Sequence, residues 1–338
     1  MIKWGILGLG NAASSFAEAI KEVENAKLIS IASLSKTKLK SFGKKFNIVE
    51  NYRFNTYQDL INNEEVDAVY IATLNNTHAE LTIKLAEAKK NILCEKPMAL
   101  DKNEAKQILA KLVKSKVLFL EAIAYRSHPQ SEVLNKLILE DEIGQIKRIK
   151  SSFGFAARNL FKFFPKHRLF NRKLGGGAIL DVGCYPSSFS LMIARLIKKQ
   201  DQELKFELKD VRGKINFRGT DDEAYAKLIF KDQFEAELNV AITKKMENTT
   251  IISGSKGQII IKDPWLPNKK VFLEVNTKTK KSKKDIISKY SIYANSIKYA
   301  SDLIEQKEIN CLFPLMTLED SMINIQILDK WKNILYNK

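Results

Sequence analysis

The amino-acid sequence predicts an α/β fold, with an N-terminal parallel sheet and a C-terminal α+β domain built on a large, open, mostly antiparallel sheet. Over about the first 120 residues, strand-like and helix-like segments alternate. Repeated units of this kind imply a parallel sheet with right-handed crossovers. From about residue 146, strand-like segments follow one another directly, which is typical of antiparallel pairing. The length of 338 residues suits two domains.

Hydrophobic spacing predicts the elements of the first part. Apolar residues spaced i, i+3, i+4 and i+7 from Ala13 onward predict the first helix. Short apolar runs predict strands at residues 2–7, 27–34, 66–73, 91–94 and 117–122. Further helices are expected at residues 36–46, 78–89 and 102–114. We therefore expect residues 1–122 to form one domain.

The second part, residues 123–338, is expected to form the α+β domain. From Phe234 to Val240, apolar and polar residues alternate, which describes a sheet with one covered face. Strands are expected at residues 146–155, 204–217, 225–230, 234–243, 249–253 and 258–261. Helical patterns return at residues 288–305 and 318–334, and these final helices can pack back on the first domain.

The charge balance needs an explanation, because a net charge of +17 could indicate nucleic-acid binding. The excess is mostly lysine and is spread along the chain. Its one dense run, Lys278–Lys284, lacks interleaved aromatic residues. We interpret it as a solvated surface and expect no nucleic-acid partner.

Composition also bears on compartment and metal content. Three widely spaced cysteines, Cys94, Cys184 and Cys311, and only three histidines predict neither a disulfide framework nor a metal site. No apolar run reaches the ~18 residues that a membrane span needs. The N-terminus lacks the apolar run and cleavage site of a signal peptide. We expect a cytoplasmic protein without a membrane partner.

A glycine-rich turn joins the first predicted strand to the first predicted helix. Gly8-Leu9-Gly10-Asn11-Ala12-Ala13 fits the pattern G-x-G-x-x-A. The first glycine permits the tight turn, and the second lets the backbone approach a pyrophosphate at the helix N-terminus. In this setting the motif predicts a Rossmann domain that binds a dinucleotide through Gly8, Gly10, Asn11 and Ala12.

The end of the second predicted strand bears on the choice of cofactor. A fold specific for NAD usually has an acidic residue there, for the adenosine ribose. Residues 32–38 contain no acid, and the hydroxyl of Ser33 and the ammonium of Lys38 suit a 2′-phosphate. We therefore favour NADP and keep NAD as the alternative.

Downstream motifs carry a resemblance to a known family. Glu95-Lys96-Pro97 follows the predicted strand at 91–94, where open α/β sheets place their ligands. Related blocks stand at residues 121–130, 168–170 and 174–186, the last containing Asp181 and Tyr185. In this order and spacing, the chain resembles the Gfo/Idh/MocA family of oxidoreductases. The resemblance is greatest to its branch of dihydrodiol and NADP-dependent xylose dehydrogenases.

The resemblance implies roles for individual residues. Lys96 would contact both nicotinamide and substrate hydroxyl, Tyr185 would be the general acid/base, and Asp181 would orient the substrate. Thr73, Asn75, His78 and Glu95 would contribute cofactor contacts. Arg126, His128 and Arg168 would contact substrate, although a structural role for His128 is an equal alternative.

The function that follows is hydride transfer between NAD(P)(H) and a CH–OH carbon of a sugar, polyol or cyclic diol. The alternative is a sensor of the same fold that binds NAD(P) without catalysis. The resemblance also implies a homodimer or homotetramer formed through the C-terminal sheet. Residues 153–174 are rich in phenylalanine, arginine and lysine, and their role stays open between a packed loop and a lid over the substrate.

Overall fold

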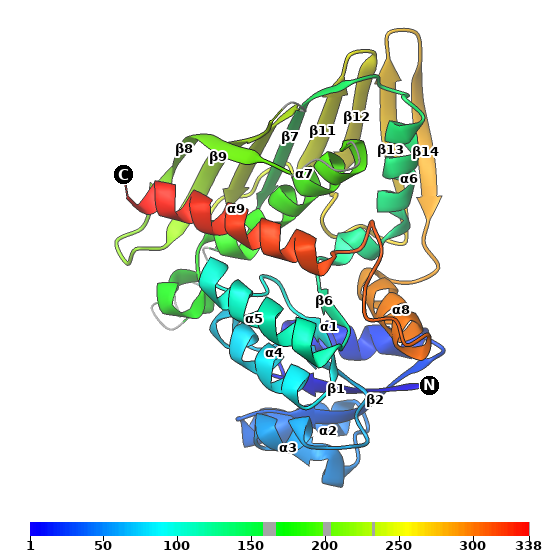
Figure 1. The fold of residues 1–338 in the computed structure, drawn as a ribbon, viewed down its shortest axis with the longest axis vertical. Coiled ribbons are helices and arrows are strands. Elements are labelled where there is room, and N and C mark those ends of the chain that lie inside the picture. Colours follow the sequence, from blue (N-terminus) through cyan, green and yellow to red (C-terminus); the bar gives the residue numbers. More distant parts are fainter. Residues whose placement is uncertain (158–166, 199–203, 232–233, 338) are drawn as a thin grey trace. The chain divides into compact units, whose positions relative to one another are not determined.

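The structure is a computed structural model that describes residues 1–157, 167–198, 204–231 and 234–337 (Figure 1). The chain divides into two compact units. The N-terminal unit contains Met1–Ser127 and Lys289–Met322, and the C-terminal unit contains His128–Ser288 and Ile323–Lys338. Residues 289–322, which we assigned to the second domain from the sequence, therefore group with the first.

A six-stranded sheet forms the centre of the N-terminal unit. Its order is β3-β2-β1-β4-β5-β6, and every pair of neighbours is parallel. The strands are β1 (Ile2–Leu7), β2 (Ala26–Ala32), β3 (Arg53–Phe54), β4 (Ala68–Ile71), β5 (Asn91–Cys94) and β6 (Phe119–Glu121). This order is that of a dinucleotide-binding Rossmann sheet, so the predicted fold class is confirmed.

Helices cover both faces of this sheet because alternate strand residues point to opposite sides. On one face, the ring of Phe16 stacks on Tyr70 with a centroid distance of 4.3 Å. On the other, Gly5 leaves room for Leu60. The helices of this unit are α1 (Asn11–Ala19), α2 (Lys36–Lys45), α3 (Tyr57–Ile61), α4 (His78–Glu87), α5 (Lys102–Ser115) and α8 (Ile292–Glu305).

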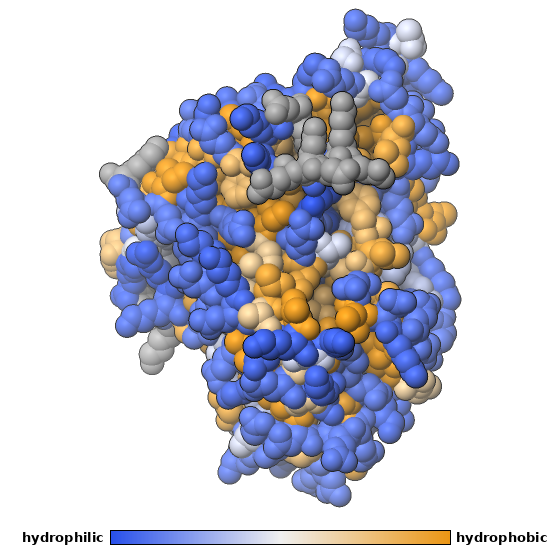
Figure 2. Space-filling model, viewed as in Figure 1, coloured by the Kyte–Doolittle hydropathy of each residue, from blue (hydrophilic) through white to orange (hydrophobic). Residues whose placement is uncertain are grey.

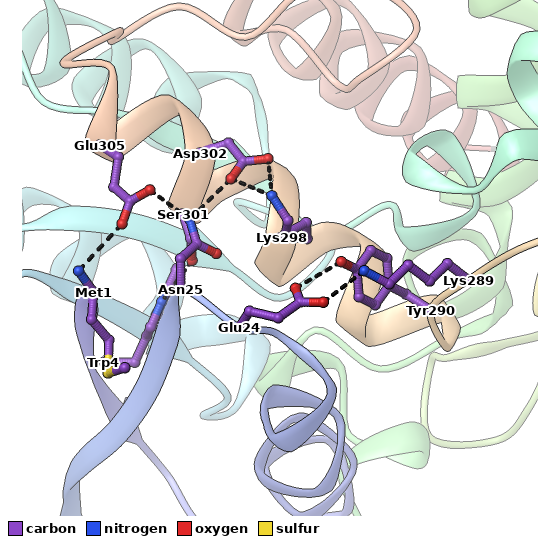
Figure 3. Close-up of polar contacts among 10 residues, drawn as sticks. All are labelled: Met1, Trp4, Glu24, Asn25, Lys289, Tyr290, Lys298, Ser301, Asp302 and Glu305. Carbon is purple, nitrogen blue, oxygen red and sulfur yellow. Dashed lines mark hydrogen bonds and ion pairs between the residues drawn. The ribbon is translucent and has the colours of Figure 1, made fainter.

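Polar contacts explain why α8 belongs to the N-terminal unit although it comes late in the chain (Figure 3). Buried Trp4 donates from Nε1 to Ser301 Oγ at 3.1 Å. The Asn25 amide donates to both Asp302 and Glu305. Just before α8, Lys289 donates to Glu24 at 2.6 Å. These contacts join the start of the chain to residues 289–305.

The C-terminal unit contains an eight-stranded sheet of order β14-β13-β12-β11-β7-β10-β9-β8. Only the pair β7–β10 is parallel. The strands are β7 (Ile146–Gly154), β8 (Phe206–Ile215), β9 (Asp221–Phe230), β10 (Phe234–Ala241), β11 (Thr249–Gly254), β12 (Gly257–Lys262), β13 (Lys270–Thr277) and β14 (Lys281–Ile287). In β10 the apolar residues from Phe234 to Val240 are buried and the polar ones between them are not, as the alternation predicted.

Two helices pack on this sheet, α6 (Pro129–Leu139) against β13 and β14, and α7 (Cys184–Ile197) against β7 and β10. Figure 1 shows both on the same face. A third helix, α9 (Leu318–Tyr336), joins the C-terminal unit from Ile323 onward. Among the described residues, the stretch Arg172–Ile197 has the length and apolar composition of a membrane span, but its apolar window is fully buried, as in a core helix.

The lysine run Lys278–Lys284 lies at the tip of the β13–β14 hairpin. Its five lysines are exposed, and the tip forms a hydrophilic surface at the top of Figure 2. This placement agrees with a solvated surface.

Candidate functional site

The glycine turn after β1 is built for close approach of a ligand to the backbone. Gly8 has a φ of +84°, and a Cβ there would lie 2.8 Å from the carbonyl oxygen of Ala72. At Gly10 a Cβ would meet nothing within 4 Å, so the side facing outward is open. Gly10 also precedes α1 at Asn11 without any side-chain cap on the first N–H groups. An uncapped helix N-terminus beside an open turn fits a pyrophosphate.

The predicted 2′-phosphate contacts lie where β2 ends. Ser33 is buried and its Oγ accepts from the amide of Ser35 at 3.2 Å. Ser35 caps α2 by accepting from the amide of Lys38. The side chain of Lys38 is exposed on the first turn of α2. The structure therefore brings Ser33 and Lys38 to one corner of the N-terminal unit.

The loop after β4 contains Thr73, Asn75 and His78. His78 is fully buried, and its Nδ1 lies 2.8 Å from the carbonyl oxygen of Pro97. Its Nε2 lies 3.4 Å from the carbonyl oxygen of Thr73. This imidazole therefore connects the loop after β4 with the loop after β5, and Asn75 is buried beside it.

Lys96 is the second residue after β5 and is half-buried. Its neighbour Glu95 accepts a hydrogen bond of 2.5 Å from the hydroxyl of Tyr70, and the Lys96–Pro97 peptide is cis. Tyr293 lies close to both Glu95 and Lys96. Burial raises the pKa of Tyr293, and the Glu95 carboxylate adds to the shift. At neutral pH this neighbour is therefore an uncharged phenol.

Glu121 also supports the Lys96 loop, although the sequence did not indicate it. Its Oε1 accepts from the amide of Met98 at 2.9 Å. Burial raises the pKa of Glu121 to about 7, and the hydrogen bond from the Met98 amide opposes the shift. A buried carboxylate thus holds the residues immediately after Lys96-Pro97.

The carboxyl ends of β1, β4 and β5 carry the glycine turn, the Thr73–His78 loop and Lys96, and these three strands are neighbours in the sheet. Ligands of open α/β sheets bind at such an edge. The structure therefore brings together the residues predicted to bind cofactor.

We predicted that Arg126 contacts substrate, but the structure places its side chain in the interior of the N-terminal unit. It forms a buried ion pair with Asp320, and both side chains are almost without solvent exposure. Both residues belong to the N-terminal unit. The pair joins the segment after β6 to the start of α9, which is a structural position.

His128 also takes the structural role that was the alternative. It is fully buried at the N-cap of α6, and its Nδ1 accepts from the amide of Gln130 at 3.1 Å. Burial lowers the pKa of this imidazole, which favours the neutral form.

Asp181 and Tyr185 lie in one continuous helical segment of the C-terminal unit. A π-helical turn, Ile179–Gly183, contains Asp181 and leads into α7, where Tyr185 is the second residue. Such turns are frequent at functional sites because the extra residue redirects side chains. Asp181 accepts from Arg168 Nη1 at 2.9 Å, so two of the predicted site residues meet.

Aromatic side chains surround Tyr185. The ring of Phe153 meets it edge-on with a centroid distance of 5.1 Å, and Trp265 lies at 6.1 Å. Trp265 is fixed by a hydrogen bond from Nε1 to the carbonyl oxygen of Ser152 at 2.9 Å. We did not single out Trp265 from the sequence, since an isolated tryptophan carries no motif. Half of the phenylalanine, arginine and lysine residues of the 153–174 segment lie in 158–166, outside the described residues.

In the described ranges, no group of three or more histidine, cysteine, aspartate or glutamate side chains is placed to hold a metal ion. The three cysteines are buried thiols without disulfides.

Comparison with known proteins agrees with a Rossmann domain followed by a second domain. Residues 2–122 match the model of an oxidoreductase family with an NAD-binding Rossmann fold, and residues 132–260 match a GFO/IDH/MocA C-terminal domain. Trans-1,2-dihydrobenzene-1,2-diol dehydrogenase of Xenopus tropicalis is 27% identical over 335 residues, which is 97% of this chain and 96% of that protein.

Solved structures share the fold. A 3-ketoreductase from Actinomadura kijaniata, in complex with NADP and TDP-benzene, has a TM-score of 0.83 and 22% identity, covering 97% of this chain and 96% of that one. An aldose–aldose oxidoreductase from Caulobacter crescentus, complexed with glycerol, has a TM-score of 0.84 and 22% identity, covering 98% and 96%.

Proposed function

The chain belongs to the Gfo/Idh/MocA family of oxidoreductases, and we propose that it transfers hydride reversibly between NADP(H) and a hydroxyl-bearing carbon of a sugar, polyol or cyclic diol. The observation that carries this proposal is the position of Lys96 at the end of β5, beside the glycine turn after β1 and the loop after β4. The relatives named for diol and aldose substrates support the substrate class.

The nicotinamide cofactor, when bound, supplies the hydride acceptor or donor. Gly8, Gly10 and the first N–H groups of α1 would hold its pyrophosphate. Thr73, Asn75 and His78 would contact the cofactor between its pyrophosphate and Lys96. The buried His78 imidazole, whose Nδ1 lies 2.8 Å from the carbonyl oxygen of Pro97, connects that loop to the loop after β5.

We assign the adenosine 2′-phosphate to Ser33 and Lys38. The residues after β2 offer a hydroxyl, backbone N–H groups and an ammonium, with no carboxylate to repel the phosphate. An ammonium near a phosphate stabilises it as a point charge. This arrangement favours NADP over NAD.

Proton handling is assigned to Tyr185 and Lys96. During reduction, the Tyr185 phenol would donate its proton to the substrate oxygen and become a phenolate; during oxidation, the phenolate would take the proton of the substrate hydroxyl and become the phenol again. The ammonium of Lys96 stabilises the negative charge that develops on the substrate oxygen. Asp181, oriented by Arg168, accepts a hydrogen bond from a neighbouring substrate hydroxyl.

The two units have different tasks in this proposal. The N-terminal unit binds cofactor, and the C-terminal unit binds substrate and supplies the surface for subunit association. The face of the eight-stranded sheet that carries Glu235, Glu237 and Asn239 would join two subunits into a dimer, or four into a tetramer. We propose a cytoplasmic location for the enzyme.

The experiment is a nicotinamide absorbance assay of the purified protein, with NADP and NAD in parallel, over a panel of aldoses, inositols and cyclic diols. We expect turnover with at least one member and higher kcat/KM with NADP. Lys38→Glu should reverse the cofactor preference, whereas Lys40→Glu, an exposed lysine of the same helix, should not. Tight cofactor binding without turnover over the whole panel would support a sensor instead.

A further inference from the structure

We propose that Asp221 and Tyr336 position the segment that carries Asp181 and Tyr185, so that this pair sets the geometry of proton transfer without touching substrate. The inference rests on the proposed function, since it gives Asp221 and Tyr336 a positioning role in that hydride-transfer reaction. All four residues belong to the C-terminal unit.

The contact begins at the N-terminus of the π-helical turn. The amide of Ile179, the first residue of that turn, donates to Asp221 Oδ2 at 2.7 Å. Helix N-terminal N–H groups lack partners within the helix, so an external carboxylate at this point fixes where the helix begins. Asp181 lies two residues after Ile179, and Tyr185 lies one turn beyond it.

Tyr336, the last residue of α9, holds the carboxylate in place. Its hydroxyl donates to Asp221 Oδ1 at 2.8 Å and accepts from the Asp221 amide at 2.9 Å. The guanidinium of Arg172 stacks over the Tyr336 ring at 4.4 Å from its centroid. Asp221 is therefore bound at both carboxylate oxygens, one by the catalytic segment and one by the last helix.

The glycine-rich loop before the turn is shaped for the same contact. Gly177 has a φ of +110°, and a Cβ at that position would overlap with the Asp221 carboxylate. At Gly176 a Cβ would lie 2.5 Å from the carbonyl oxygen of Arg168. The loop thus packs against Asp221 on one side and against the Arg168 segment on the other, which links Asp221 to both residues of the Arg168–Asp181 ion pair.

A buried carboxylate is costly unless it is hydrogen-bonded and paired with other charges. Asp221 is 1% exposed. Burial raises its pKa to about 6, while the Ile179 and Tyr336 hydrogen bonds and the charge of Lys332 oppose the shift. The groups that face it are therefore Tyr336, Lys332 and, through the Tyr336 ring, Arg172. At neutral pH Asp221 is ionised and accepts both hydrogen bonds; below about pH 6 it takes up a proton and its hold on Ile179 weakens.

The test compares Asp221→Ala, Asp221→Asn and Tyr336→Phe with wild type. We expect Asp221→Ala to lower kcat roughly 10- to 100-fold, because small displacements of catalytic groups have effects of this size. KM for the cofactor should stay within about twofold, since no contact to it is removed. Asp221→Asn keeps an oxygen that accepts from Ile179, so it should retain more activity than the alanine variant. It should also lose the acidic limb near pH 6 from its kcat profile.

Hydrogen exchange over residues 178–185 gives a readout that needs no substrate. Asp221→Ala should accelerate exchange there by roughly tenfold, with no change over β12. Asp141→Asn, an exposed aspartate of the same unit, is the matched control, and Ile286→Ala is a control for loss of stability alone. Unchanged exchange over 178–185 in Asp221→Ala would overturn the inference. A loss of kcat in Asp221→Ala that is no greater than the loss in a control variant of equal stability would also overturn it. If Tyr185→Phe is inactive while Asp221→Ala behaves as wild type, the positioning role fails and the proposed function stands.

Discussion

Arg168 and Asp181 form an ion pair in which Nη1 lies 2.9 Å from Oδ1. The Asp181 side chain is only 6% exposed, whereas that of Arg168 is 41% exposed. The almost buried Asp181 carboxylate is therefore oriented by a cationic side chain that is itself partly exposed. The ion pair links Arg168 to the helical segment that carries Asp181 and Tyr185.

Arg168→Met should therefore affect catalysis more than stability. Loss of the partner lets the Asp181 carboxylate rotate, and kcat/KM should fall roughly tenfold or more. The free energy of unfolding should change by less than about 1 kcal/mol, since half-exposed pairs contribute little. Steady-state kinetics and urea unfolding measure the two effects. Lys136→Met, which removes an exposed pair with Glu140, is the control, and equal kinetics in both variants would refute the role of Arg168.

Gly8→Ala should weaken cofactor binding. The substitution places a Cβ 2.8 Å from the carbonyl oxygen of Ala72 at a φ of +84°, so the turn after β1 has to move. Fluorescence titration with NADPH should show at least about a tenfold loss of affinity. Gly219→Ala is the matched control, because Gly219 also has a positive φ, +78°, but a Cβ there meets nothing within 4 Å. Retained affinity in Gly8→Ala would mean that the cofactor binds elsewhere.

The buried pair Arg126–Asp320 should contribute to stability. Asp320→Asn leaves an uncompensated guanidinium in the interior, and removal of one partner of a buried pair costs about 3–5 kcal/mol. Urea unfolding checks this value. Lys84→Met, which removes the exposed pair with Glu80, should cost less than about 1 kcal/mol. A similar small loss in both variants would show that the interior pair is dispensable.

Glu121→Gln should change how stability depends on pH. The pKa of Glu121 is raised from 4.5 to about 7 in the folded state, so the native state binds more protons than the unfolded state between these values. The contribution of Glu121 to the free energy of unfolding is therefore fully present at low pH and is lost as pH rises through about 7. Relative to wild type, the glutamine variant should gain stability between pH 5 and pH 8. Parallel stability curves for the two proteins would contradict the shift.

Much of the fold was predictable because its local patterns agree with the structure. The expected strand at 91–94 is β5, and the expected helix at 36–46 is α2, which ends one residue earlier. The two-residue strand β3 was missed, since two residues cannot show a period. The helix α6 was also missed, although Pro129 at its first turn is a typical start.

The cofactor residues were predictable because motif and element coincide in sequence. The supporting groups were not, because they come from distant parts of the chain. Asp221 lies 42 residues after Ile179, and Asp320 lies 194 residues after Arg126. No local pattern marks such partners. Arg126 consequently looked like a site residue until its buried partner was known.

The central claim, that Tyr185 and Lys96 handle the substrate proton, is tested most directly by kcat of Tyr185→Phe on the best substrate with saturating NADP. Removal of one oxygen should lower kcat roughly 100-fold or more with cofactor affinity unchanged, and Lys96→Met should lower kcat by a similar factor. Tyr225→Phe, a tyrosine on β9 whose ring packs against Arg212, should behave as wild type. Turnover of Tyr185→Phe near the wild-type rate would remove this tyrosine from the mechanism and contradict the account.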